Sequence, residues 1–205
     1  MKLKRCVYLG SALMLLSSCA TMNQQECLTA NWQQIGLADG ANGYRISQID
    51  AHRQACAEYG VTPDLQAYTL GYQQGLKAYC APANGYQVGY EGKAYYGQCP
   101  EAQHAAFFAA YQNGAKHFEL RSEIQRLENE YESDGRALTD LNNKIDQATL
   151  QYQIFEGSAA ELRAIGLKLE QLKQQRFELL YQRAQAQRDI DARQAQLSAL
   201  PLPQF

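Results

Sequence analysis

The sequence lacks an apolar run long enough to cross a membrane. Its longest hydrophobic stretch, residues 7–16, would span about 15 Å as a helix, roughly half of a bilayer core. The positive residues Lys2, Lys4 and Arg5 precede this stretch. A short apolar run after a basic terminus is typical of a removable signal peptide, here residues 1–18, and not of a permanent transmembrane helix.

The residues that close the signal resemble the lipobox of bacterial lipoproteins, in the order Leu-Ser-Ser-Cys ending at Cys19. Cleavage before Cys19 and its acylation would give a stable lipid anchor, since each buried CH₂ contributes about 0.8 kcal/mol. Ala20 stands where an Asp typically retains such proteins at the inner membrane. The resemblance therefore implies an outer-membrane anchor facing the periplasm. The alternative is an ordinary secretory signal with a chance cysteine.

The sequence also lacks an excess of positive charge. The whole chain carries a formal net charge of −2, and removal of the signal takes three positive side chains with it. The mature chain is therefore more acidic, which argues against nucleic acid as a partner.

No C-x-x-C pair occurs, and the sequence has only three histidines. Cys6 leaves with the signal and Cys19 would be acylated, so four cysteines remain in a compartment that favours disulfides. His52 and Cys56 lie one helical turn apart, but an oxidised thiol serves neither as a metal ligand nor as a nucleophile. We therefore expect no metal, cofactor or thiol catalysis, and place His104 and His117 on the surface. The four cysteines are Cys27, Cys56, Cys80 and Cys99.

Helix geometry ranks the possible disulfides. We predict one helix from Ser47 to Tyr59, ended by Gly60, and a second from Pro63 to about Cys80 with Thr62 as its N-cap. A short link makes the two antiparallel, so Cys56 and Cys80 would lie about 25 Å apart, beyond disulfide reach of about 7 Å. This leaves 27–56 with 80–99, or 27–80 with 56–99. We favour the local pairs, 27–56 and 80–99.

Glycine and tyrosine dominate residues 32–100, with nine tyrosines between Tyr44 and Tyr96. The spacing G-x-x-x-G-x-x-G occurs at 36–43 and at 85–92, and G-x-x-x-G at 71–75. This spacing places glycines on one helix face, where they favour close approach of two helices. The alternative is tight turns at Asp39-Gly40, Asn42-Gly43 and Asn84-Gly85. We favour short helices ended by glycine, and a loop over residues 92–99.

The same region resembles the DUF2799 family of bacterial lipoproteins and periplasmic proteins of unknown function. The resemblance rests on W-x-x-I-G-x-x-D-G-x-x-G at 32–43, Y-x-x-G-x-x-x-G-L-x-x-Y-C at 68–80, N-G-Y-x-x-G-Y-x-G-x-x-Y at 84–95 and Cys-Pro at 99–100. It covers roughly residues 23–115. It implies no activity, because the family has no assigned catalytic or binding residues.

Three residues are candidates for binding. Trp32 and Tyr44 could stack on sugars of peptidoglycan or polysaccharide, although core packing also explains the many aromatic residues. Asp39 lies between Trp32 and the glycine cluster, and its alternative role is to cap a turn. A hydrolase would need two carboxylates that converge beside a cleft, and no motif in the sequence has such a spacing.

Residues 117–200 predict an antiparallel coiled-coil hairpin. Leucines and isoleucines keep a heptad frame to Phe155, Gly157 breaks the helix, and Ser158 with Glu161 forms a capping box that restarts it. Both arms have about 40 residues, or roughly 60 Å. A break at Asp134-Gly135 is the alternative. The predicted seam positions are Leu120, Ile124, Leu127, Tyr131, Leu138, Leu141, Ile145, Ala148, Tyr152 and Phe155, then Leu162, Ile165, Leu169, Leu172, Leu179 and Ile190.

The sequence thus predicts a mainly α protein: a linker at 19–31, a disulfide-stapled helical domain at 32–116, the hairpin at 117–200 and a tail at 201–205. We expect a non-enzymatic structural or protein-interaction component of the cell envelope. Phe155 at the turn of the hairpin would either meet another envelope protein or close the turn. The alternative function is a glycan-binding module that uses the Trp- and Tyr-rich domain.

Overall fold

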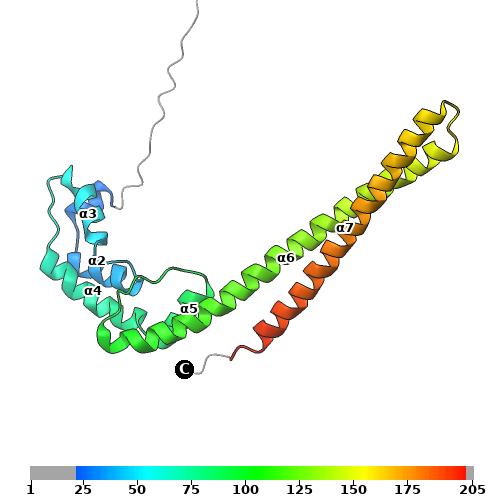
Figure 1. Ribbon diagram of the computed structural model, residues 1–205. Helices are drawn as coiled ribbons and strands as arrows, with labels where there is room; N and C mark the ends of the chain where they lie inside the picture. Colours follow the sequence, from blue (N-terminus) through cyan, green and yellow to red (C-terminus); the bar gives the residue numbers. More distant parts are fainter. Residues whose placement is uncertain (1–21, 202–205) are drawn as a thin grey trace, which may run out of the picture. The chain divides into compact units, whose positions relative to one another are not determined.

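The computed structural model describes residues 22–201, and helices are the only regular elements among them. The signal peptide, Cys19 and residues 202–205 lie outside the described residues. The helices (Figure 1) are α1 (Gln24–Leu28), α2 (Trp32–Ala41), α3 (Gln48–Ala57), α4 (Leu65–Tyr79), α5 (Pro82–Tyr90), α6 (Glu101–Gln153) and α7 (Ala159–Ser198). Within the described part of the chain, no helix is both long and apolar enough to span a bilayer.

The chain divides into two compact units, and the boundary along the sequence falls between Ala78 and Tyr79. The boundary falls at the end of α4, inside the stretch predicted as one domain from 32 to 116. The predicted start of the hairpin at residue 117 falls within α6, which runs without interruption from Glu101 to Gln153. The predicted boundary therefore lies within one continuous helix, which packs against α5 and against α7.

The N-terminal unit has two helices that touch through their backbones. A Cβ atom at Gly36 or Gly40 of α2 would overlap the carbonyl oxygen of Tyr68 or Tyr72 of α4. In the opposite direction, a Cβ at Gly71 would overlap the carbonyl oxygen of Gln33. The glycines thus permit close approach of α2 and α4, as the spacing predicted. The Asp39-Gly40 turn was the wrong alternative, because both residues lie inside α2.

Caps and a disulfide fix the ends of helices α1, α3 and α4. Asn23 forms a capping box with Glu26 at the start of α1, and the Cys27–Cys56 disulfide joins α1 to α3. The prediction of Thr62 as N-cap and Pro63 as first helical residue was wrong. The Asp64 carboxylate accepts a hydrogen bond from the Ala67 amide at 2.9 Å, so α4 begins after Asp64. An aspartate cap satisfies an amide that would otherwise lack a partner.

The second unit begins with another glycine contact. A Cβ at Gly89 of α5 would overlap the carbonyl oxygen of Tyr111 of α6, and one at Gly114 of α6 would overlap that of Tyr86. The Cys80–Cys99 disulfide links the two ends of this segment, which completes the local pairing that we favoured. Asn84-Gly85 lies within α5 and makes no hairpin turn.

Three glycines end their helices as the sequence predicted. Gly43 follows α2 with φ of 73°, Gly60 follows α3 with φ of 69°, and Gly92 follows α5 with φ of 70°. A left-handed backbone at this position is open to glycine at little cost. The loop expected over residues 92–99 is present, and Pro100 occupies the N-cap position of α6.

Helices α6 and α7 of the hairpin lie side by side over most of their shared length (Figure 1). Asp134-Gly135 does not break α6, and the predicted capping box of Ser158 and Glu161 starts α7. One cluster of the seam consists of Leu141, Ile145, Leu169 and Leu172, with Ala148 beside it. Tyr152 is exposed and was wrongly assigned to the core.

Two further details of the hairpin differ from a uniform leucine seam. Arg183 occupies a core-type position, where its guanidinium stacks over the Tyr131 ring at 3.9 Å and donates to the Tyr131 carbonyl at 3.3 Å. The ring of Phe155 covers Gly157, where a Cβ would overlap it. Phe155 therefore closes the turn, which is the second of the two roles expected for it.

Candidate functional site

A buried polar cluster forms where three helices of the N-terminal unit meet. Asp39 of α2 accepts a hydrogen bond from the Tyr68 hydroxyl of α4 at 2.7 Å. The same carboxylate oxygen, Oδ2, lies 2.8 Å from Nε2 of His52 on α3. All three side chains are buried. The cluster therefore ties α2, α3 and α4 together through one carboxylate.

The electrostatics of the cluster keep Tyr68 protonated. Burial raises the pKa of the Tyr68 hydroxyl far above its ordinary value, and the bond to Asp39 raises it further. Burial also raises the pKa of Tyr72, whose hydroxyl donates to the Tyr44 carbonyl at 2.8 Å. Both phenols are hydrogen-bond donors throughout the physiological pH range, and neither is available as a base.

An open pocket of about 430 Å³ lies beside this cluster. Its polar lining comes from α1, α2 and α3 and from the link before α2, while Met22, Ile35 and Ala38 add apolar surface. Carboxylate, imidazole and amide groups at one opening suit hydrogen bonding to a small polar ligand. The polar residues are Glu26, Thr29, Asn31, Gln34, Asp39 and His52.

The three binding candidates do not form one surface. Trp32 is 8% exposed, so its indole is a core group and the prediction of a sugar-stacking face there was wrong. Tyr44 is 52% exposed, and Asp39 is buried in the cluster described above. Asp39 is neither a turn nor a cap residue, since its side chain bonds to residues from two other helices.

The surface position expected for His117 was also wrong, while His104 is half-buried. His117 is buried, and its ring makes an edge contact with the Tyr86 ring at 5.7 Å between centroids. Its Nε2 has no hydrogen-bond partner among the described residues. His104 lies 2.8 Å, through Nδ1, from the Tyr95 hydroxyl. Nothing in the sequence indicated these contacts, which come from Tyr86 and Tyr90 of α5 for His117 and from Tyr95 of the following loop for His104.

The described residues offer little for metal or thiol chemistry. All four cysteines of residues 22–201 are in disulfides. Across the same residues, no three His, Cys, Asp or Glu side chains gather as a metal site would require. The Asp39–His52 pair supplies two such groups in one place.

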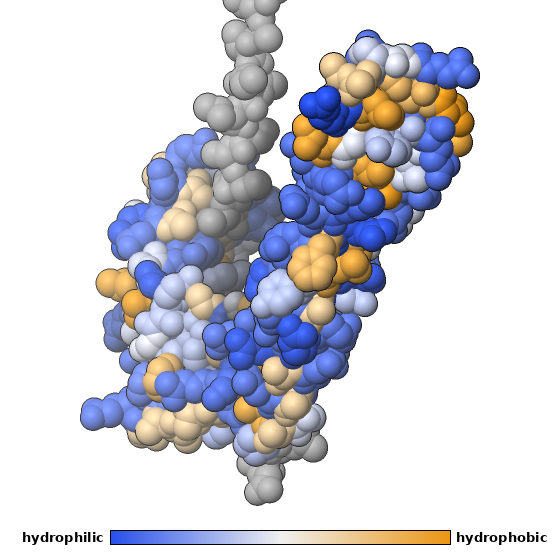
Figure 2. All heavy atoms as spheres, turned by 45° about the vertical axis from the view of Figure 1, so that its right-hand side comes forward, coloured by the Kyte–Doolittle hydropathy of each residue, from blue (hydrophilic) through white to orange (hydrophobic). Residues whose placement is uncertain are grey.

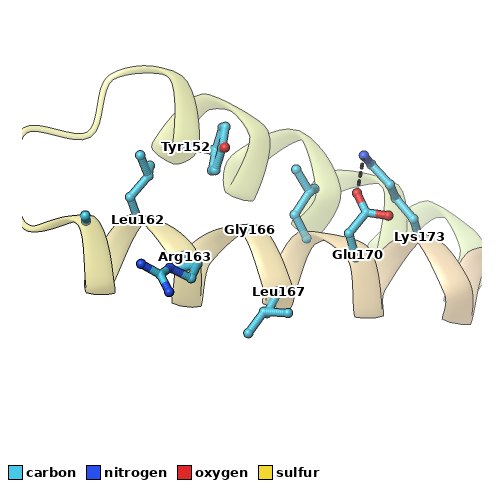
Figure 3. Close-up of a pocket in the computed structure, with 9 residues that line it drawn as sticks. Tyr152, Leu162, Arg163, Gly166, Leu167, Glu170 and Lys173 are labelled. Atoms are coloured by element: carbon cyan, nitrogen blue, oxygen red, sulfur yellow. Dashed lines mark hydrogen bonds and ion pairs between the residues drawn. The ribbon is translucent and has the colours of Figure 1, made fainter.

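A second candidate surface lies on the hairpin, near its turn. An open groove of about 620 Å³ runs along the first turns of α7. In Figure 3, Tyr152 of α6 leans over Gly166, while Arg163 and Leu167 point away from α6. Glu170 and Lys173 form an ion pair of 2.8 Å at the far end of the groove. The Tyr152 ring packs close to Gly166, where a Cβ would lie 3.3 Å from it.

Large apolar side chains continue along α7 beyond the groove. Phe177 is 73% exposed and Tyr181 54%, and Leu180 is exposed as well, as is Leu167 in the groove itself. The turn end of the hairpin, which comes forward in Figure 2, is rich in apolar residues. A two-helix hairpin with a leucine seam does not need these side chains for its own core, so they form a surface open to a partner.

The sequence did not predict that His52 and Tyr68 form a cluster with Asp39, because the three positions share no periodic spacing. A signal for the α7 surface was present. Phe177 and Tyr181 fall between the seam positions Leu172, Leu179 and Ile190, and large apolar residues off the seam indicate a second contact face.

One comparison with known proteins gives a match. Residues 31–116 match the model of DUF2799, described as a protein family of unknown function. No curated protein and no solved structure matches the chain. The matched segment holds α2 to α5 and the first turns of α6, and therefore the glycine contacts between helix backbones and the Asp39 cluster. The chain thus carries a DUF2799 region at residues 31–116, as the sequence resemblance predicted.

Proposed function

We propose that this protein is an outer-membrane lipoprotein that faces the periplasm and serves as a non-enzymatic interaction component of the cell envelope. Its hairpin is the interacting element. The observation that supports this proposal is the apolar surface of α7, where Phe177, Tyr181 and Leu167 are exposed although the hairpin has its own seam. Surfaces of this kind mark contacts between proteins.

Site-specific photo-crosslinking in cells tests the role of the hairpin. A photoreactive residue in place of Phe177 is expected to trap a specific protein. The matched control is the same residue in place of Lys168, which is exposed on the same helix but two and a half turns away and so on the opposite flank. Equal or absent crosslinking at the two positions would contradict the proposal.

The anchor is tested separately. A clickable fatty acid supplied to cells is expected to label the full-length chain, and Cys19→Ser is expected to abolish the label. Labelling that persists in Cys19→Ser would exclude the lipobox interpretation.

A second candidate function is favoured by the pocket beside Asp39 and His52. In this proposal the N-terminal unit binds a glycan of the envelope through hydrogen bonds, with no stacking on Trp32. Purified sacculi should retain the wild-type protein and lose a Gln34→Ala variant, in which one polar group of the pocket lining is removed. Tyr44→Ala is the matched control, since Tyr44 is exposed outside the pocket. Equal retention of all three would dismiss the glycan proposal.

A further inference from the structure

Four exposed residues on α7 share one face and a symmetric order. Glu170, Phe177, Tyr181 and Arg188 follow one another at intervals of seven, four and seven residues. These intervals correspond to about two, one and two helical turns, so the four side chains lie on one side of the helix. None of them belongs to the buried seam with α6.

The two outer residues of this face carry opposite charges and the two inner ones are aromatic, so the face is complementary to an antiparallel copy of itself. If a second α7 lies antiparallel, with the two-fold axis between Phe177 and Tyr181, each Glu170 faces Arg188 of the other copy. Each Phe177 then faces the other Tyr181. We infer that this face of α7 binds a second copy of the chain, with the two α7 helices antiparallel. A two-fold interface of this kind uses the same surface on both copies.

The charges select this arrangement over the parallel one. In a parallel pair, Glu170 would face Glu170 and Arg188 would face Arg188, and both contacts would be repulsive. In the antiparallel pair both contacts are attractive, and two aromatic pairs are buried between them. Aromatic pairs contribute about 0.5–1.5 kcal/mol beyond the area that they bury. The intramolecular ion pair of Glu170 with Lys173 competes little, because it is exposed.

The size of the contact indicates where it forms. The distance from Glu170 to Arg188 along the helix is about 27 Å, so one strip of helix covers less than the roughly 800 Å² per partner of a standard interface. A weak contact becomes effective when both copies are held at one surface, which raises their effective concentration. The inference therefore rests on the proposed function, a lipid-anchored interaction protein.

Charge reversal in two differently tagged full-length copies tests this pairing in cells. Both copies carry the photoreactive residue at position 177, and the readout is the crosslinked product that contains both tags. Glu170→Arg in both copies, or Arg188→Glu in both, creates two repulsive contacts and is expected to lower the product about tenfold. One copy with Glu170→Arg and the other with Arg188→Glu makes both contacts attractive again. This mixture is expected to restore the product, which also shows that both variants fold.

Lys168→Glu and Asp189→Arg are the matched controls, since they reverse the same kinds of charge on exposed flanks of α7 outside this face. They are expected to leave the product unchanged. Failure of the mixture to restore the product would overturn the antiparallel pairing. Crosslinking from position 177 to a different protein, with no product between copies, would overturn the second copy as partner and support the proposed function. No crosslinking of any kind would contradict both.

Discussion

The N-terminal unit and the hairpin both consist of paired helices, but the helices meet in opposite ways. In the N-terminal unit, α2 and α4 touch through glycine backbones, and the core contains a hydrogen-bonded cluster around Asp39. In the hairpin, α6 and α7 touch through leucine and isoleucine side chains. The first arrangement leaves no room for additional atoms, while the second can adjust its side chains.

This difference indicates which region tolerates change. Backbone contact fixes the separation of two helices, since there is no rotamer to move when an atom is added. A leucine seam fixes mainly the register, and its outer faces are free to carry a second surface such as the one on α7. The N-terminal unit is thus expected to be the more sensitive of the two to small substitutions.

The largest effect is expected for Asp39→Ala. His52 and Tyr68 would both lose their buried acceptor, and removal of one partner from a buried charged network costs about 3–5 kcal/mol. Urea denaturation followed by circular dichroism measures the loss. Tyr68→Phe removes a single donor, and about 1 kcal/mol is expected for it. Equal, small effects of the two variants would show that the cluster does not hold the unit together.

Gly71→Ala should also destabilise the protein, by about 1–3 kcal/mol, because its Cβ would overlap the Gln33 carbonyl and push α2 from α4. The midpoint of urea unfolding reports the change. If Gly71→Ala were as stable as wild type, the backbone contact would not set the distance between these helices.

Gly135→Ala in α6 is expected to stabilise the protein. A Cβ there would meet only the end of the Arg183 side chain at 3.4 Å, an ordinary contact with a flexible group. Alanine is better than glycine in a helix interior by about 0.5–1 kcal/mol. Thermal unfolding should show a higher Tm. A lower Tm would mean that α6 and α7 are packed at Gly135 as tightly as α2 and α4 are at their glycines.

The smallest effect concerns the start of α7 and its dependence on pH. Hydrogen bonds from the Ser158 hydroxyl and amide lower the pKa of the Glu161 carboxyl below its ordinary value. The ionised Glu161 carboxylate therefore contributes its full stabilisation of the first turn of α7 above the ordinary pKa of a glutamate. This stabilisation is lost as the pH falls through the lower pKa of the folded state. Amide exchange in the first turn of α7 should accelerate on acidification in wild type, and be independent of this titration in Glu161→Gln.

Local signals explain why much of the fold was predictable. The capping box at Ser158, the heptad frame and the glycine spacing each act over a few residues, and all three appear in the structure. Helix lengths alone excluded a Cys56–Cys80 disulfide. The errors occurred where a distant segment decides burial, as for Trp32 and His117, because the type of a residue and its local sequence do not show which other segment covers it.

By itself, the sequence determined the helical class and the hairpin and excluded a Cys56–Cys80 disulfide, and it favoured the local disulfides and the glycine contacts, because each depends on spacing along one helix or between neighbours. Only the tertiary structure decided that Asp39, His52 and Tyr68 share one carboxylate oxygen, since these residues come from three helices without a common period. It also decided that Phe177 and Tyr181 stay exposed, because exposure depends on where the second arm of the hairpin lies. The contact around Asp39 and the open face of α7 are thus products of packing.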